Sequence, residues 1–265
     1  MYKKYLIDIG KRQYEELVKM TVADNQIKNV ERDMLIEFYN KFTEISSING
    51  IDQMNELFPI DDYDIFISHS HKNIEEARAL KNFLEMNLNL KVFIDCDFWQ
   101  SADDFLKELD NLYCIKDNGF YSYEKRNITT SHIHVMLSIS IIKAIQSSEI
   151  VFFVGSSDFS SEINGDSLSG IKSPWIFLEA YLSTIMIEIP KRLSQRFVDE
   201  SFQHKQSKGI DIRYNLDIKD LKKINITKLE KWHKMYLVEK YKSLGEKKNT
   251  LDLLYILLGE TKSES

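Results

Sequence analysis

Glycine, proline and cysteine are all scarce in this chain of 265 residues, with nine, three and two copies. The few glycines form neither a G-x-G-x-x-G nor a G-x-x-x-x-G-K-S/T motif, which excludes a dinucleotide fingerprint and a P-loop. No G-x-S-x-G elbow is present, which argues against an α/β-hydrolase. Two cysteines, Cys96 and Cys114, cannot form a disulfide framework or a four-cysteine metal site.

A basic surface and a secretion signal are also lacking. The formal net charge is −6, so a nucleic-acid partner is not expected. The N-terminus has charges before and inside its short apolar patch, unlike a signal peptide. The longest uncharged run, residues 127–142, contains Ser, Thr, Asn and His and is too short to span a bilayer. These features predict a globular cytoplasmic protein with no membrane partner.

A strand, a polar turn and a helix follow one another across residues 63–88. Aromatic and β-branched residues dominate 63–67, which is typical of a buried strand. Asn73 and Glu76 have the spacing of a helix capping box. Over 74–88 the apolar residues recur every three or four positions, which predicts a helix with one buried face. In an open α/β sheet such a turn lies where ligands bind.

The rest of the chain predicts an α/β fold with additions at both ends. Strand, helix and strand over about thirty residues form the unit of a parallel sheet. Further strands are expected at 91–96 and 149–156, with a fourth left open at 185–189 and an edge strand at 210–216. Helices are expected at 134–147, from Pro174 onward, and at about 228–242 and 250–258. We expect residues 1–60 to be a helical extension, with a short helix around Tyr14 and a longer one over 30–42. Residues 100–133 are expected to be a long insert.

Glu179 is the carboxylate that stands out. It lies four residues after Trp175, on the same face of the helix that begins at Pro174. A solvated Glu on an amphipathic helix is the ordinary interpretation. The apolar neighbours of Glu179 and the expected position of its helix at the carboxyl edge of the sheet favour a functional role instead.

The histidine pairs do not predict a metal site. His69 and His71 share one face of a strand, but no Cys or carboxylate lies at a spacing typical of zinc ligands. These two histidines are expected to line the polar turn after the first strand. No metal and no resident cofactor are therefore expected.

Four segments together resemble the Toll/interleukin-1 receptor (TIR) domain family. YDIFISHSHKN is similar to its first strand and loop, and KVFIDCDFW to its second strand. AIQSSEIVFFVGS is similar to its helix-to-third-strand passage, and SPWIFLE to its S-x-W-x-x-x-E helix. The resemblance covers residues 61–220 and implies a flavodoxin-like, five-stranded parallel sheet flanked by helices. Residues 221–265, outside it, are expected to form C-terminal helices packed on this domain.

The resemblance also implies an activity. Enzymatic TIR proteins of bacterial antiphage defence cleave NAD at the nicotinamide–ribose bond, giving ADP-ribose or a cyclised ADP-ribose signal. Their catalytic Glu corresponds to Glu179. NAD would then be a substrate, and it would be bound by residues near the sheet's carboxyl edge: Ser68, His69, Ser70, His71, Asp95, Phe98, Trp99 and Trp175. For the aromatic residues core packing is an equal alternative.

Partners and rival functions stay open at this point. The resemblance implies self-association and, because no effector domain is recognisable, a separate effector protein that senses the product, as in systems resembling Thoeris. The alternatives are a non-enzymatic TIR adaptor and a base-exchange enzyme resembling nucleoside deoxyribosyltransferases.

Overall fold

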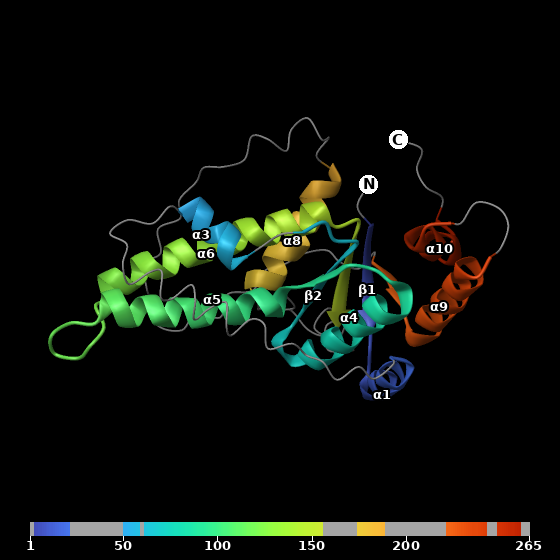
Figure 1. Cartoon of the computed structure of the whole chain (residues 1–265), viewed down its shortest axis with the longest axis horizontal. Helices are drawn as coiled ribbons and strands as arrows, with labels where there is room; N and C mark the ends of the chain where they lie inside the picture. Colours follow the sequence, from blue (N-terminus) through green and yellow to red (C-terminus); the bar gives the residue numbers. More distant parts are fainter. Residues whose placement is uncertain are drawn as a thin grey trace, which may run out of the picture. The chain divides into compact units, whose positions relative to one another are not determined.

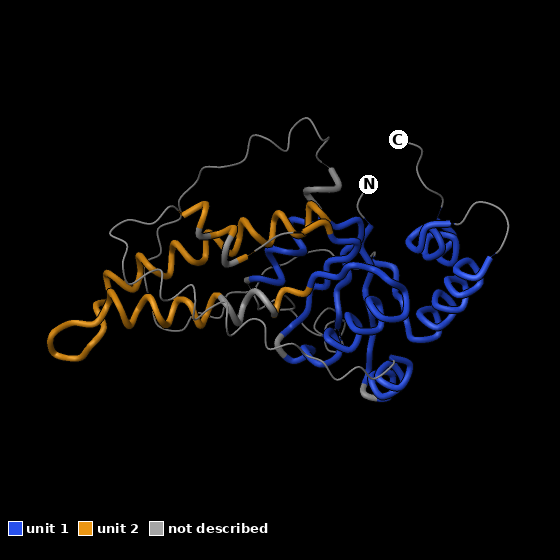
Figure 2. The backbone as a smooth tube through the Cα atoms, viewed as in Figure 1, with its two compact units in different colours: residues 1–22, 63–93, 148–265 blue, residues 23–62, 94–147 orange. Residues whose placement is uncertain are grey.

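The computed structural model describes residues 3–21, 50–58, 61–155, 174–188, 221–242 and 248–260. They belong to two compact units (Figure 2). The first unit takes in residues 1–22, 63–93 and 148–265, and the second takes in 23–62 and 94–147. The first unit therefore draws on chain before, within and after the predicted 61–220 domain.

A five-stranded parallel sheet forms the core of the first unit, in the order β3-β2-β4-β1-β5 (Figure 1). Every residue of β2 and β4 is buried, as expected for parallel strands covered on both faces. The predicted flavodoxin-like α/β fold is confirmed. The strands are β1 (Lys3–Asp8), β2 (Ile65–His69), β3 (Val92–Ile94), β4 (Ile150–Gly155) and β5 (Lys222–Ile224).

The helices of the first unit lie on both faces of this sheet. From β2 the chain crosses to β3 at one edge, and the described strand that follows β4 is β5 on the opposite edge. Right-handed crossovers in opposite directions place the intervening helices, α4 and α8, on opposite faces (Figure 1). α1 and α9 pack against α4, whereas α8 contacts β2. The helices are α1 (Lys11–Met20), α4 (Ile74–Leu88), α8 (Pro174–Glu188), α9 (Ile226–Lys240) and α10 (Thr250–Leu257).

The N-terminal strand is the main correction to the sequence interpretation. The prediction of an entirely helical segment over 1–60 is wrong for Lys3–Asp8, which form β1 between β4 and β5. If strands are counted from β2, β1 occupies the place of the fourth strand in the flavodoxin order 2-1-3-4-5. The short helix around Tyr14 is confirmed as α1. The helix predicted over 30–42 lies outside the described residues.

Other element boundaries also differ from the prediction. The second predicted strand ends at Ile94 rather than Cys96, because α5 (Asp95–Leu109) begins there. Residues 185–188 continue α8 and are not a strand. β5 falls within the segment predicted as C-terminal helices, whereas α9 and α10 confirm the two helices predicted after it. The strand predicted over 210–216 lies outside the described residues.

The second unit is a helical hairpin with a short helix against it. α5 runs into a π-helical turn (Asp110–Cys114), and α6 (Tyr123–Ser147) returns alongside α5. A β-bridge between Ile115 and Tyr121 closes the connection, and α3 (Gly50–Leu57) packs on α6. The predicted 100–133 insert is thus largely helix, and the apolar helix begins at Tyr123 rather than at His134.

Length and composition alone would allow α6 to cross a membrane. Its most apolar window of 18 residues has a mean hydropathy of 1.4, and 33% of that window is buried. Six α6 residues are buried within the protein, among them Ile133, Leu137 and Ile141. A core helix of a water-soluble protein meets the same criteria, so α6 does not decide where the protein resides.

Candidate functional site

The candidate site lies between the adjacent strands β2 and β4, at the carboxyl end of the sheet. Connections from these strands leave toward opposite edges of the sheet. In open α/β sheets such a switch point opens a crevice at the carboxyl ends of the strands, where ligands bind. Ser68 and His69 end β2 at this edge, and Val154 and Gly155 end β4.

Glu179 and Ser68 meet at this point. The Ser68 hydroxyl donates a hydrogen bond to Glu179 Oε2 over 2.5 Å. The exposed fraction is 0% for Glu179 and 1% for Ser68. This hydrogen bond links α8 to the carboxyl end of β2. It agrees with the predicted position of both residues at one edge of the sheet. The interpretation of Glu179 as a solvated surface carboxylate is wrong.

Burial of this carboxylate has an energetic cost. A charge removed from water costs several kcal/mol unless hydrogen bonds compensate for it. The neighbours of Glu179 on α8, Ile176 and Ala180, are buried and apolar. An apolar residue would fill the same space without that cost. A buried carboxylate at a ligand-binding edge is therefore a candidate for chemistry rather than for stability.

The turn after β2 is tighter than predicted. A 3-10 turn over His71–Asn73 precedes α4, and Asn73 N–H donates to the Ser70 carbonyl over 2.8 Å. The predicted capping box is wrong, because the Asn73 side chain makes no cap hydrogen bond. Instead its Oδ1 accepts a hydrogen bond from Ser70 Oγ over 2.6 Å. His69 is buried, with an exposed fraction of 7%. The side chain of His71 lies outside the described parts.

Three predicted substrate residues belong to the second unit. Asp95 is the first residue of α5 and is buried. Phe98 and Trp99 lie on the same helix, and their side chains lie outside the described parts. In the first unit Trp175, half-buried, stands at the start of α8. The roles of these four residues in binding stay predictions.

Comparison with protein-family models, with curated proteins and with solved structures gives no match for this chain. The TIR resemblance therefore stays a resemblance of motifs, and the function stays a proposal.

Asp8 is a polar residue at the same sheet edge that sequence reasoning missed. It ends β1 and is in register with Gly155 at the end of β4. Its position depends on β1 being a strand, and β1 has only three consecutive apolar residues between charged ones. No motif draws attention to a lone Asp after such a short run.

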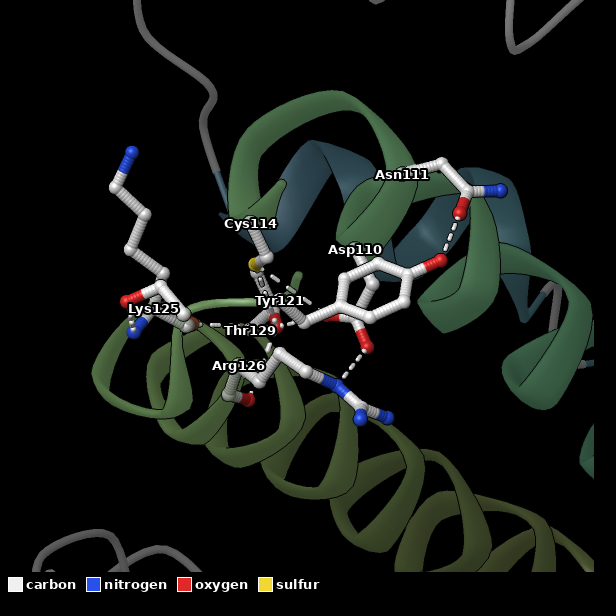
Figure 3. A network of polar contacts seen from close by, with 8 residues as sticks. Asp110, Asn111, Cys114, Tyr121, Lys125, Arg126 and Thr129 are labelled. Carbon is white, nitrogen blue, oxygen red and sulfur yellow. Dashed lines mark hydrogen bonds and ion pairs between the residues drawn. The ribbon is translucent and has the colours of Figure 1, made fainter. Parts of the chain in front are cut away.

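A second polar cluster, in the hairpin of the second unit, has a structural role (Figure 3). Asp110 is 4% exposed and accepts hydrogen bonds from Arg126 Nε and Thr129 Oγ1, both over 2.7 Å. Burial raises the pKa of the Cys114 thiol, whose Sγ lies 3.5 Å from Asp110 Oδ1. These contacts join the start of α6 to the end of α5. A protonated thiol and a fully engaged carboxylate are poor reagents.

Metal ligands do not gather in the described part of the chain. No group of three or more His, Cys, Asp or Glu side chains there could hold an ion.

Proposed function

We propose that this protein cleaves NAD at the bond between nicotinamide and ribose, as a signalling enzyme of bacterial antiphage defence. The observation that carries the proposal is the buried Glu179 carboxylate, held by Ser68 at the switch point of a flavodoxin-like sheet. The W-x-x-x-E spacing from Trp175 to Glu179 adds to it. The products are nicotinamide and ADP-ribose, or a cyclised form of ADP-ribose.

One carboxylate is enough for this reaction. Ordinary glycosides need a general acid, because their leaving oxygen must be protonated. Nicotinamide in NAD is cationic and departs neutral with the bonding electron pair, so positive charge develops on the ribose. Glu179 would stabilise that charge electrostatically or capture the sugar carbon covalently. Water then adds to the same carbon and releases a proton; in cyclisation a nitrogen of the adenine takes the place of water.

Ser68 would act on the orientation of the carboxylate. Its hydroxyl holds Oε2, which fixes the plane of the carboxyl group relative to β2. A nucleophile or electrostatic stabiliser works best when its geometry is set before the substrate arrives. We therefore assign Ser68 a positioning role and not a role in bond breaking.

Full burial of Glu179 has a consequence for regulation. A substrate can reach a side chain with 0% exposure only after some covering segment moves. We therefore expect a low basal rate that rises on self-association or on an infection signal. The predicted homo-oligomer is the simplest activator, and turnover per protomer should then increase with protein concentration.

The direct test is to incubate the purified chain with NAD, with and without lysate of phage-infected cells, and to identify products by mass spectrometry. Replacing Glu179 with Gln should lower the rate by at least about a hundredfold, with an unchanged far-ultraviolet circular dichroism spectrum. Glu75→Gln is the matched control, because Glu75 is an exposed carboxylate on α4. Undiminished turnover by Glu179→Gln would refute the assignment.

The same assay separates the rival functions. Supplying a deoxynucleoside with a second base tests base exchange: formation of the new nucleoside, without nicotinamide release from NAD, would favour the deoxyribosyltransferase alternative. A chain that leaves both substrates unchanged but binds TIR domains would favour the adaptor.

A further inference from the structure

We propose that Asp8 is a substrate-binding residue of the same site and that it accepts hydrogen bonds from the adenosine ribose of NAD. The inference rests on the proposed function and names how the enzyme would select NAD over NADP. It starts from the position of β1 inside the sheet, which no motif indicates.

The register of three adjacent strands places Asp8 on the face of Glu179. Asp8 pairs with Gly155, and two residues earlier Leu6 pairs with Phe153. Phe153 also pairs with Ser68. Residues in register on parallel strands point to the same face, and so do residues two apart on one strand. Asp8 therefore shares a face with Ser68, whose hydroxyl bonds to Glu179 of α8.

Gly155 contributes no side chain between Asp8 and Ser68. Gly155 pairs with Asp8 and lies on β4, the strand between β1 and β2. As a glycine it has no side chain on that face. Strand spacing and rise put the Cα atoms of Asp8 and Ser68 about 12 Å apart. A separation of this order between Asp8 and the Ser68–Glu179 pair suits the two riboses of NAD, which are separated by a diphosphate.

Asp8 is available for a ligand. Its side chain is half-buried, and it forms no hydrogen bond or ion pair with another residue in the described ranges. Two other acidic residues of the first unit serve the fold: Asp64 accepts from the Lys91 backbone, and Glu260 pairs with two lysines. Asp8 has no comparable structural task there.

The chemistry of a carboxylate at this position suits a ribose diol. An ionised carboxylate only accepts hydrogen bonds, and the 2′- and 3′-hydroxyls of a ribose can both donate. An acidic residue in dinucleotide-binding folds recognises the ribose 2′-hydroxyl in the same way. The same charge repels the 2′-phosphate of NADP. Asp8 would thus bind NAD and reject NADP.

The test compares kcat and KM for NAD and for NADP in the wild-type chain, Asp8→Asn and Asp8→Glu. For Asp8→Asn we expect KM for NAD to rise about tenfold, with kcat within about twofold, since Asp8 does not touch the reacting sugar. The preference for NAD over NADP should fall by a similar factor. Asp8→Glu retains the charge and should keep the preference. Glu15→Gln, an exposed carboxylate on α1, should behave as wild type.

The outcomes separate this inference from the proposed function. An active wild type whose Asp8→Asn variant keeps both KM and the cofactor preference overturns the role of Asp8 alone. A wild type without turnover contradicts the proposed function, and calorimetric titration with ADP-ribose then tests Asp8 directly. Binding that Asp8→Asn weakens supports Asp8, and absent or equal binding overturns it. Should Asp8→Asn fail to fold, Asp8→Ser takes its place in each comparison, since it also removes the charge: an unchanged NAD-to-NADP ratio overturns the role of Asp8, and a reduced ratio supports it.

Discussion

The hydroxyl of Ser68 holds one oxygen of a carboxylate that has no access to water. Replacing Ser68 with Ala removes the donor and leaves Glu179 Oε2 buried without it. We expect kcat for NAD cleavage to fall about tenfold and the free energy of unfolding to fall by about 1–3 kcal/mol. Enzyme assays and denaturant titration measure the two effects.

Ser183→Ala is the matched control for Ser68→Ala. Ser183 is equally buried on α8, but its hydroxyl donates to the Ala180 carbonyl of its own helix. The control should lose little stability and no activity. Equal kinetic losses in the two variants would show that Ser68 matters only as a buried serine.

The two cysteines should differ in reactivity. Cys114 is 0% exposed, and burial raises the pKa of its thiol, whereas Cys96 is partly exposed. Since the thiolate is the reactive form, iodoacetamide at pH 8 should alkylate Cys96 first in the folded protein. Peptide mass spectrometry after timed quenching follows both sites. Faster labelling of Cys114 would contradict the structure of the hairpin end.

At the scale of elements, the hairpin of the second unit depends on Asp110. Asp110→Ala removes the acceptor of Arg126 Nε and Thr129 Oγ1 (Figure 3). We expect this variant to lower the local opening free energy around the connection by about 1–3 kcal/mol. Hydrogen exchange should quicken over residues 105–130 but stay unchanged in the sheet strands.

Asn111→Ala serves as the control for that prediction. It removes an exposed hydrogen bond from the Tyr121 hydroxyl, 2.6 Å long, at the same end of the hairpin. Water can replace an exposed partner, so the exchange pattern should barely change. Faster exchange throughout the chain in Asp110→Ala would instead indicate global unfolding.

Elements with strong patterns were predictable, and weak ones were not. The helix over 74–88 was placed at its observed bounds because its apolar residues recur at helical spacing. β4 was found because it is a continuous apolar run. β1 was missed because three apolar residues between charged ones fit a helix or a strand equally well. Its identity depends on partners more than a hundred residues away.

The candidate site also has residues that the sequence predicts and one that it does not. Ser68 and Glu179 were predictable, since each belongs to a motif and the strand of Ser68 is expected to end where the helix of Glu179 begins. Asp8 was not, because nothing local distinguishes it and only the register across three strands places it on the same face. Long-range pairing is the information that a local pattern lacks.

For the whole molecule, the clearest pH prediction concerns Glu260, which joins the C-terminal region to the sheet. Partial burial raises the pKa of Glu260, but hydrogen bonds from Lys222, Tyr5 and Lys3 outweigh it, so the pKa is lowered overall. A carboxyl with a lowered folded pKa stabilises above its unfolded value of about 4.3 and loses that contribution as pH falls through the folded pKa. We expect the melting temperature to drop on acidification below about pH 4.3.

Two buried tyrosines, Tyr5 and Tyr255, make the stability of the protein depend on pH on the alkaline side as well. Burial, with hydrogen bonds to Glu260 and Glu149, raises the pKa of Tyr5 and Tyr255. Their contribution is present below the unfolded pKa of about 10 and is lost as pH rises further.

Glu260→Gln should lower the melting temperature at pH 7 and flatten its acid dependence, as measured by calorimetry. An unchanged acid slope in that variant would contradict the role of Glu260.

The interior place of β1 in the sheet has a consequence for folding during synthesis. During synthesis β1 leaves the ribosome before both of its sheet neighbours, β4 and β5, so it has no strand to pair with until most of the protein has emerged. Such distant pairing slows folding and exposes a ready edge to other chains. Trimming the first sixty residues as a dispensable leader would remove an interior strand of the sheet, and the remainder should collect in inclusion bodies.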